Sequence, residues 1–105
     1  GLAFKENCPD LRNSRVIDIV EEFEGLNSSV DIFDPWVSKD KAMHEYNVQL
    51  IEQPIFGKYD AIILAVAHDV FKKIPLEELK AFGKDEHVIY DIKYLLNLNE
   101  VDGRL

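Results

Sequence analysis

The sequence predicts an α/β domain of three layers, in which a mainly parallel sheet carries helices on both faces. Strand-like and helix-like segments alternate along the chain with short connections, as they do in parallel sheets. The clearest strand, residues 60–67, is apolar at nearly every position, which is typical of a central strand covered on both sides. With 105 residues, of which 47% are hydrophobic, the chain is large enough for one domain with its own core.

The first half of the chain is expected to form two helices and three short strands. Asn13 or Ser14 is placed to cap a helix over residues 15–24, and Gly25 is placed to end it. Apolar residues recur in this helix at the spacing of one face, so that face is expected to be buried. The other elements expected here are strands at residues 1–4, 30–33 and 48–51 and a Ser38-capped helix that runs to about residue 46.

The second half continues the alternation after the central strand. Pro75 suits the start of a helix that ends at Gly83, because proline is tolerated in the first turn and glycine favours a helix end. The other elements expected here are a helical turn at residues 70–73 and a last strand at residues 87–91, whereas residues 94–105 show no clear periodicity.

Charge and cysteine content narrow the classes of function. The formal net charge of −8 argues against a general nucleic-acid surface or an anionic-membrane surface, although it leaves room for a local basic pocket. The single cysteine, Cys8, cannot form a disulfide within the chain, which fits a reducing compartment such as the cytoplasm. No run approaches the roughly 20 apolar residues of a membrane span, so neither a membrane nor a nucleic acid is an expected partner.

Polar residues follow four of the expected strands, at the edge of the sheet where ligands of open α/β folds bind. Lys5 and Lys93 are cations in this set, and together they could hold a diphosphate or a sugar. The alternative, that both lysines are simply solvated, stays open from spacing alone. The four groups are Lys5 with its loop, residues 34–36, residues 68–69 and residues 91–93.

The remaining polar candidates have structural interpretations. His68 follows the central strand and is interpreted as a local hydrogen-bonding group, while Asp34 is interpreted as part of a turn. Trp36 is expected to cover the edge of the core or an interdomain surface. No set of His, Cys, Asp or Glu residues has the spacing of a metal site. A Gly-x-Gly-x-x-Gly fingerprint is absent, so the chain is not expected to be the main holder of NAD.

The opening segment resembles one family. Residues 4–14 read Phe-Lys-Glu-Asn-Cys-Pro-Asp-Leu-Arg-Asn-Ser, which is similar to the start of the C-terminal domain of the UDP-glucose/GDP-mannose dehydrogenase family. The sequence of this segment is most similar to the branch that acts on UDP-N-acetylhexosamines, and the Asp-Gly-Arg-Leu sequence at residues 102–105 resembles that branch too. The resemblance implies a Rossmann-like domain that binds the UDP part of the substrate.

The resemblance also implies contacts with the substrate. In the family, the Phe-Lys pair contacts the nucleotide sugar, which implies Phe4 and Lys5 here. A basic residue after the last strand does the same, and Lys93 stands where many members have the arginine of an Asp-Gly-Arg motif. Lysine keeps the charge but loses the bidentate geometry of arginine. Arg104 is expected to approach the substrate or a neighbouring domain.

Cofactor binding and catalysis are expected to depend on other parts of the enzyme. The family arginine that reaches toward bound NAD corresponds to Arg12, and the alternative interpretation is a pair between Arg12 and Asp10. Cys8 is not interpreted as the catalytic cysteine of the family, which lies in a glycine-rich segment that this chain lacks. The resemblance therefore implies no catalytic residue in the chain.

The resemblance implies that residues 1–105 are the C-terminal domain of a longer, homo-oligomeric enzyme. An N-terminal domain would bind NAD, a central helical region would form the dimer, and the enzyme would oxidise C6 of a UDP-sugar to a carboxylate for polysaccharide synthesis. The chain by itself is expected to be inactive. The alternative is a non-catalytic interaction or signalling domain. A receiver-like module would need an acidic pair after the first strand, where this chain has Phe4 and Lys5.

Overall fold

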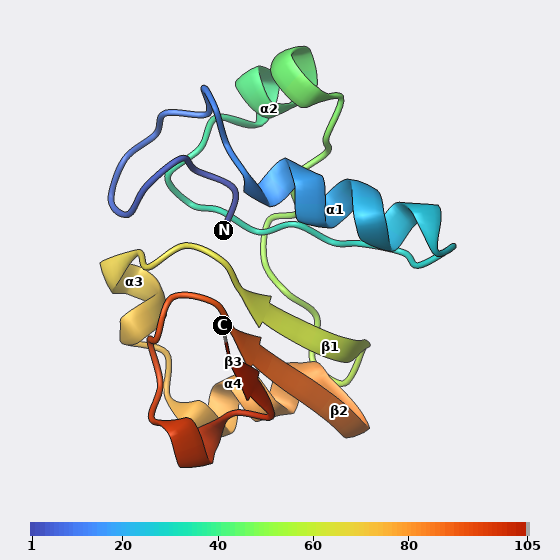
Figure 1. Ribbon diagram of the computed structural model, residues 1–105, viewed down its shortest axis with the longest axis vertical. Coiled ribbons are helices and arrows are strands. Elements are labelled where there is room, and N and C mark those ends of the chain that lie inside the picture. The colour runs from blue at the N-terminus through green and yellow to red at the C-terminus, as the bar shows by residue number, and fades with distance from the viewer. Residues whose placement is uncertain (105) are drawn as a thin grey trace.

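The computed structural model describes residues 1–104, with side chains as far as Gly103. Figure 1 shows the chain in two parts, one of which holds the N-terminal segment with helices α1 (Val16–Gly25) and α2 (Lys39–Tyr46). The other part holds the sheet with helices α3 (Asp69–Lys72) and α4 (Leu76–Phe82). Within residues 1–104, no helix is long and apolar enough to cross a membrane.

The sheet is parallel, and its strands stand in the order β1 (Tyr59–Leu64), β2 (Gly83–Asp91) and β3 (Gly103–Arg104). Helix α4 lies between β1 and β2 in the sequence, as the crossover between parallel strands requires. At the carboxyl ends of the first two strands, Leu64 lies opposite Asp91. The predicted α/β class with a parallel sheet is confirmed, and the segments that follow β1 and β2 emerge at the same edge.

Two of the three strands expected in the first half are reduced to a single contact. Among the described residues, segments 30–33 and 48–51 meet in one isolated parallel bridge between Ile32 and Leu50. The Ile51 amide donates to the Ile32 carbonyl at 2.9 Å, which is the beginning of a ladder that goes no further. The expectation of two full strands here is therefore wrong in extent, although the two segments do lie side by side.

The start of the chain binds side chains instead of pairing in the sheet. The Leu2 amide donates to Asp34 Oδ2 at 2.7 Å, so residues 1–4 are not the strand that their apolar sequence suggests. The buried Ser14 hydroxyl donates to the Leu2 carbonyl at 2.6 Å. The expected cap of α1 is wrong as a consequence: Arg15 occupies the N-cap position and, in the described structure, forms no capping hydrogen bond with its side chain.

The other helices begin where local signals predict. Ser38 caps α2 and its Oγ accepts a hydrogen bond from the Lys41 amide at 3.3 Å. Asn47 follows the last residue of α2 as its C-cap and has a left-handed backbone with φ of 56°. Pro75 precedes α4 and Gly83 follows it, as expected from the sequence. These positions are confirmed because each depends only on residues within one turn of the helix end.

The C-terminal part contains two elements that the sequence did not indicate. A 3-10 helix, η1 (Leu98–Glu100), begins at Asn97, whose side chain and that of Glu100 form a reciprocal capping box. Strand β3 follows and pairs with the end of β2. The absence of a clear period in this region reflects the shortness of both elements.

Buried apolar residues form two clusters, one for each part of the chain. The first gathers around the N-terminal segment and helices α1 and α2, and the second lies between the sheet and α4. The members of the first are Leu2, Ala3, Leu11, Val20, Ile32, Val37, Ala42, Leu50 and Val66, and those of the second are Leu64, Leu79, Phe82 and Ile89.

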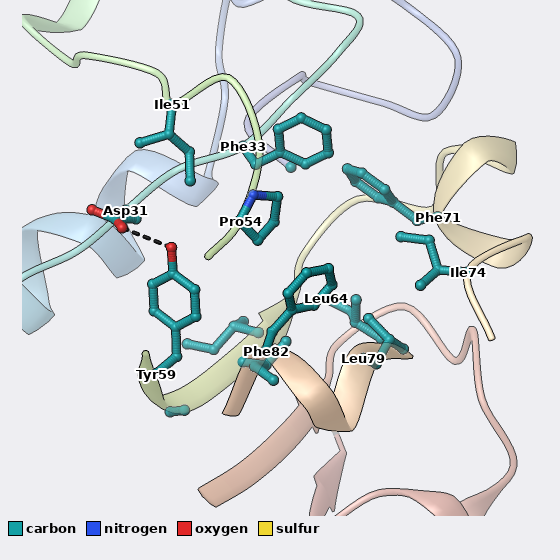
Figure 2. Close-up of a pocket in the computed structure, with 14 residues that line it drawn as sticks. Asp31, Phe33, Ile51, Pro54, Tyr59, Leu64, Phe71, Ile74, Leu79 and Phe82 are labelled. Atoms are coloured by element: carbon teal, nitrogen blue, oxygen red, sulfur yellow. Dashed lines mark hydrogen bonds between the residues drawn. The ribbon is translucent and has the colours of Figure 1, made fainter. Parts of the chain in front are cut away.

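An apolar pocket of about 140 Å³ lies between these two clusters (Figure 2). Phe33 and Ile51 line it from the first half of the chain, and Phe71 lines it from α3. At its edge the Tyr59 hydroxyl donates to Asp31 Oδ2 at 2.7 Å. The lining offers no lysine or arginine to a diphosphate, so the basic candidates from the sequence are not part of this pocket.

Candidate functional site

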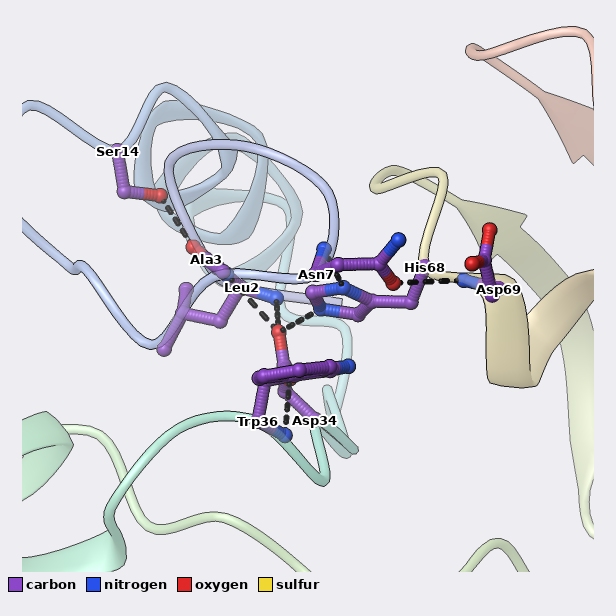
Figure 3. A network of polar contacts seen from close by, with 8 residues as sticks. All are labelled: Leu2, Ala3, Asn7, Ser14, Asp34, Trp36, His68 and Asp69. Atoms are coloured by element: carbon purple, nitrogen blue, oxygen red, sulfur yellow. Dashed lines mark hydrogen bonds and ion pairs between the residues drawn. The ribbon is translucent and has the colours of Figure 1, made fainter.

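A buried carboxylate organises the segments that come together near the N-terminus. Asp34 is 4% exposed, and its Oδ2 accepts hydrogen bonds from the amides of Leu2 at 2.7 Å and Ala3 at 2.9 Å (Figure 3). The same oxygen lies 3.0 Å from His68 Nε2, and Oδ1 accepts the Trp36 amide at 2.9 Å. Asp34 forms the expected turn with Trp36, but it also ties this turn to two distant segments.

The hydrogen bonds keep this buried carboxyl ionised. Burial by itself would raise the pKa of Asp34, because it removes the carboxylate from water. The hydrogen bonds from Leu2, His68, Ala3 and Trp36 outweigh that effect and lower the pKa below its usual range. A charged group therefore remains at the centre of the network at neutral pH.

His68 extends the network to a loop. The residue is fully buried, and its Nδ1 accepts a hydrogen bond from the Asn7 amide at 2.9 Å. Asn7 Oδ1 accepts in turn from the Asp69 amide at 2.9 Å. The hydrogen-bonding role predicted for His68 is confirmed, but the expectation that it is local is wrong, since its partners lie 61 and 34 residues away in the sequence.

The loop of residues 4–10, called here the Lys5 loop, is closed at its base by the Phe4 amide, which donates to the Asp10 carbonyl at 2.8 Å. Phe4 is 51% exposed and Lys5 is exposed as well. Within residues 1–104, no hydrogen bond or ion pair engages the Lys5 ammonium group. The structure thus holds the backbone of this loop and leaves an aromatic ring and a cation at its surface.

Arg12 lies next to this loop and is paired. Its Nε and one terminal nitrogen both lie 3.1 Å from the Asp10 carboxylate, and its own amide donates to Asp10 Oδ1 at 2.8 Å. The hydrogen bonds from the arginine lower the pKa of Asp10. The pair is on the surface, with the Arg12 side chain 83% exposed, so a ligand can still reach the guanidinium group. Both interpretations of Arg12 remain compatible with this geometry.

A second buried carboxylate holds the turn that carries Lys93. Asp91, which is fully buried, ends β2, and its two oxygens accept the Lys93 amide at 3.2 Å and the Leu96 amide at 2.8 Å. The Lys93 side chain is exposed. The carboxylate therefore folds the chain back immediately after the strand and leaves the lysine at the surface.

The segments that carry Lys5 and Lys93 come near the same edge of the view in Figure 1. Figure 1 shows the blue N-terminal loop and the orange-red segment after β2 on the same side of the view as α3. The structure describes no direct contact between Lys5 and Lys93, and the Arg104 side chain lies outside the described residues. The half-buried Cys8 lies within the Lys5 loop. Within residues 1–104, no three His, Cys, Asp or Glu side chains gather as metal ligands.

Two residues hold the Lys5 loop, and sequence reasoning missed Asn7 and did not connect His68 with this loop. The positive φ of 53° at Asn7 is a conformation that asparagine adopts more readily than most residues, which is a weak signal in the sequence. No spacing rule connects Asn7 with His68, because their contact depends on how the whole chain folds.

Comparison with known proteins places these segments in one family. Residues 1–98 match the family model described as UDP-glucose/GDP-mannose dehydrogenase family, UDP binding domain. Over all 105 residues the chain is 56% identical to UDP-N-acetyl-D-glucosamine 6-dehydrogenase of Pseudomonas aeruginosa and 48% identical to that of Salmonella typhi. Protein CapL of Staphylococcus aureus is 33% identical over 97% of the chain. The chain spans about a quarter of the length of these relatives, at 25%, 25% and 24%.

Proposed function

Because the chain belongs to the UDP-glucose/GDP-mannose dehydrogenase family and matches its UDP binding domain, we propose that it binds the UDP part of a nucleotide sugar for a longer enzyme. The proposed enzyme is an NAD-dependent 6-dehydrogenase that oxidises the C6 alcohol of a UDP-N-acetylhexosamine to a carboxylate. The names of the relatives at 56% and 48% identity support this substrate. The structural observation that supports it most is the Lys5 loop, with its fixed backbone and its exposed cation.

The proposed contacts follow from the charge of the ligand. A diphosphate is dianionic or more at neutral pH, and the exposed ammonium groups of Lys5 and Lys93 are suitable partners for charge-assisted hydrogen bonds of about 1.5–3 kcal/mol each. Phe4 offers an exposed ring beside Lys5, against which a base or sugar can pack. Arg104 is proposed as a further contact, to the substrate or to a neighbouring domain. The chain's net charge of −8 makes such local cations necessary for binding an anion.

The proposed contribution of the chain to cofactor binding is small. NAD, when bound, accepts hydride from the substrate. Arg12 is proposed to reach toward it, because the guanidinium group is exposed and has donors beyond those used by Asp10. The adenine and ribose would be held mainly by an N-terminal domain outside this chain.

We propose no catalytic residue in the chain itself. Cys8 is half-buried in the Lys5 loop, and no described hydrogen bond pairs its thiol with a base. Catalysis therefore requires the N-terminal domain, and a central helical region would join two such enzymes into an oligomer. The cytoplasmic location expected from the sequence and the role in polysaccharide synthesis remain parts of this proposal.

Titration of the 105-residue chain with UDP tests the proposal, with GDP as the control ligand and amide NMR shifts as the readout. We expect shifts at Phe4, Lys5 and Lys93 on addition of UDP. Lys5→Ala should weaken UDP binding by about tenfold, which corresponds to one charge-assisted hydrogen bond.

The matched control is Lys80→Ala, which removes the same charge from an exposed position on α4. This variant should bind UDP as the wild type does. If UDP and GDP shift the same scattered amides, or if the two alanine variants behave alike, the chain is better explained as a non-catalytic interaction domain.

A further inference from the structure

One imidazole connects three segments that are far apart in the sequence. His68 follows β1, its Nδ1 lies 2.9 Å from the Asn7 amide in the Lys5 loop, and its Nε2 lies 3.0 Å from Asp34 Oδ2 (Figure 3). Asp34 in turn holds the amides at the start of the chain. The Lys5 loop and the carboxylate that fixes its beginning are therefore linked through a single side chain.

These partners determine the tautomer of the ring. A backbone N–H only donates, so Nδ1 of His68 must be an acceptor without a proton, and the ring proton must lie on Nε2, where it is donated to Asp34. The Trp36 ring stacks on the imidazole with centroids 6.0 Å apart. The Phe71 ring packs against the imidazole in an edge contact, with ring planes at 61° and centroids 5.1 Å apart. A ring packed in this way cannot turn over without losing the bond to Asn7.

Within the part of the chain that the structure describes, two hydrogen bonds attach the middle of the Lys5 loop, and both are made by Asn7. Asn7 donates its amide to His68 and accepts the Asp69 amide at 2.9 Å through its side chain. The bond between the Phe4 amide and the Asp10 carbonyl closes only the base of the loop. Without the attachment at Asn7, the loop would be fixed at its ends and free between them.

We propose that His68 is a positioning residue for the UDP-sugar site, which acts by holding Asn7 and thereby the conformation in which the Lys5 loop presents Phe4 and Lys5. The inference rests on the proposed function and names a residue that contributes to affinity without touching the ligand. Binding to a loop that is already ordered avoids the entropic cost of ordering it in the complex. A buried histidine with a purely structural role would instead affect the stability of the chain and leave the affinity of the folded form unchanged.

Two amide substitutions separate the two bonds of the ring. Glutamine at position 68 can place its side-chain nitrogen where Nε2 lies, so His68→Gln keeps a donor to Asp34 and loses the acceptor for Asn7. Asparagine is shorter and can place its oxygen where Nδ1 lies, so His68→Asn keeps the acceptor for Asn7 and loses the donor to Asp34. Each variant is the matched control of the other.

In the folded 105-residue chain, we expect His68→Gln to weaken UDP binding by about fivefold, the equivalent of one hydrogen bond. We expect His68→Asn to bind UDP within about twofold of the wild type, although its midpoint of urea unfolding should fall, because a buried donor to the carboxylate is lost. Without ligand, the Asn7 amide should be protected from hydrogen exchange in the wild type and in His68→Asn, and exposed in His68→Gln. The ¹⁵N shifts of the wild-type ring should show a proton on Nε2 alone.

Equal UDP affinity in both variants, measured where both are folded, would overturn the positioning role. A ring proton on Nδ1, or an Asn7 amide that exchanges rapidly in the wild type, would overturn it as well. If the wild type does not bind UDP but the exchange and ¹⁵N results hold, the proposed function fails while the attachment of the loop stands. If Lys5→Ala weakens binding and His68→Gln does not, the function stands and the positioning role fails.

Discussion

Asp34 and Asp91 are both buried aspartates that accept hydrogen bonds from backbone amides, yet they stabilise different kinds of contact. Each carboxylate is almost or fully buried, stands at the end of a strand or strand-like segment and accepts hydrogen bonds from backbone amides. The partners of Asp91 lie two and five residues further along the chain. The partners of Asp34 include amides 31 and 32 residues before it and a histidine 34 residues after it.

The difference shows how one carboxylate closes a turn and the other connects segments. The bonds of Asp91 to described residues shape the stretch of chain that carries Lys93. The bonds of Asp34 fix the start of the chain and, through His68, the Lys5 loop. Lys93 therefore lies on a turn that is held by contacts between neighbouring residues, whereas the Lys5 loop is held by contacts between distant segments. Substitutions of the two aspartates should show this difference.

Asp34→Ala should have the largest effect on stability. The substitution leaves the amides of Leu2 and Ala3 and the His68 ring proton buried without an acceptor, which should lower the free energy of unfolding by about 3 kcal/mol or more. Urea unfolding followed by circular dichroism measures this loss.

Asp91→Ala provides the comparison and should cost less, about 1–2 kcal/mol, because the two amides it frees lie in a turn beside the protein surface. In the folded variant, amide NMR shifts should change around residues 91–96 and remain unchanged in the Lys5 loop. Equal losses of stability for the two variants, or NMR shift changes in both loops from either one, would contradict the proposed difference between the local contacts of Asp91 and the long-range contacts of Asp34.

Lowering the pH should reduce the stability that ionised Asp34 contributes, and this effect should be smaller than that of Asp34→Ala. The pKa of Asp34 is lowered in the folded chain, so the folded state binds fewer protons than the unfolded state at the usual pKa of an aspartate, about 3.9. The stabilisation is fully present above that pH and is lost as the pH falls through the lower folded pKa.

Asp34→Asn should remove this part of the acid dependence, since an amide does not titrate. The measurement is the free energy of unfolding between pH 7 and pH 3 for the wild type and the variant, repeated at high salt to screen general charge repulsion. Parallel curves for the two proteins would mean that the carboxylate does not stabilise the fold through its ionised form.

Local patterns in the sequence determined the α/β class, helix α2 with its Ser38 cap and helix α4 between Pro75 and Gly83. They also located β1, but the expectation that residues 60–67 form a central strand is wrong, because β1 ends at Leu64 and the middle strand of the described sheet is β2. The opening motif determined the family as well, and the comparisons confirmed it. These features depend on residues within a few positions of one another, and such residues are close in space because they are close in the sequence.

The tertiary structure alone decided where the polar side chains of the first half find their partners. Ser14, placed by sequence to cap a helix, donates to Leu2, and His68, expected to bond locally, reaches Asn7 and Asp34. A buried polar group takes whichever partner the folded chain brings within about 3 Å, since the cost of leaving it unpaired exceeds any local preference. The identity of that partner depends on contacts across 12 to 61 residues, which no local pattern encodes.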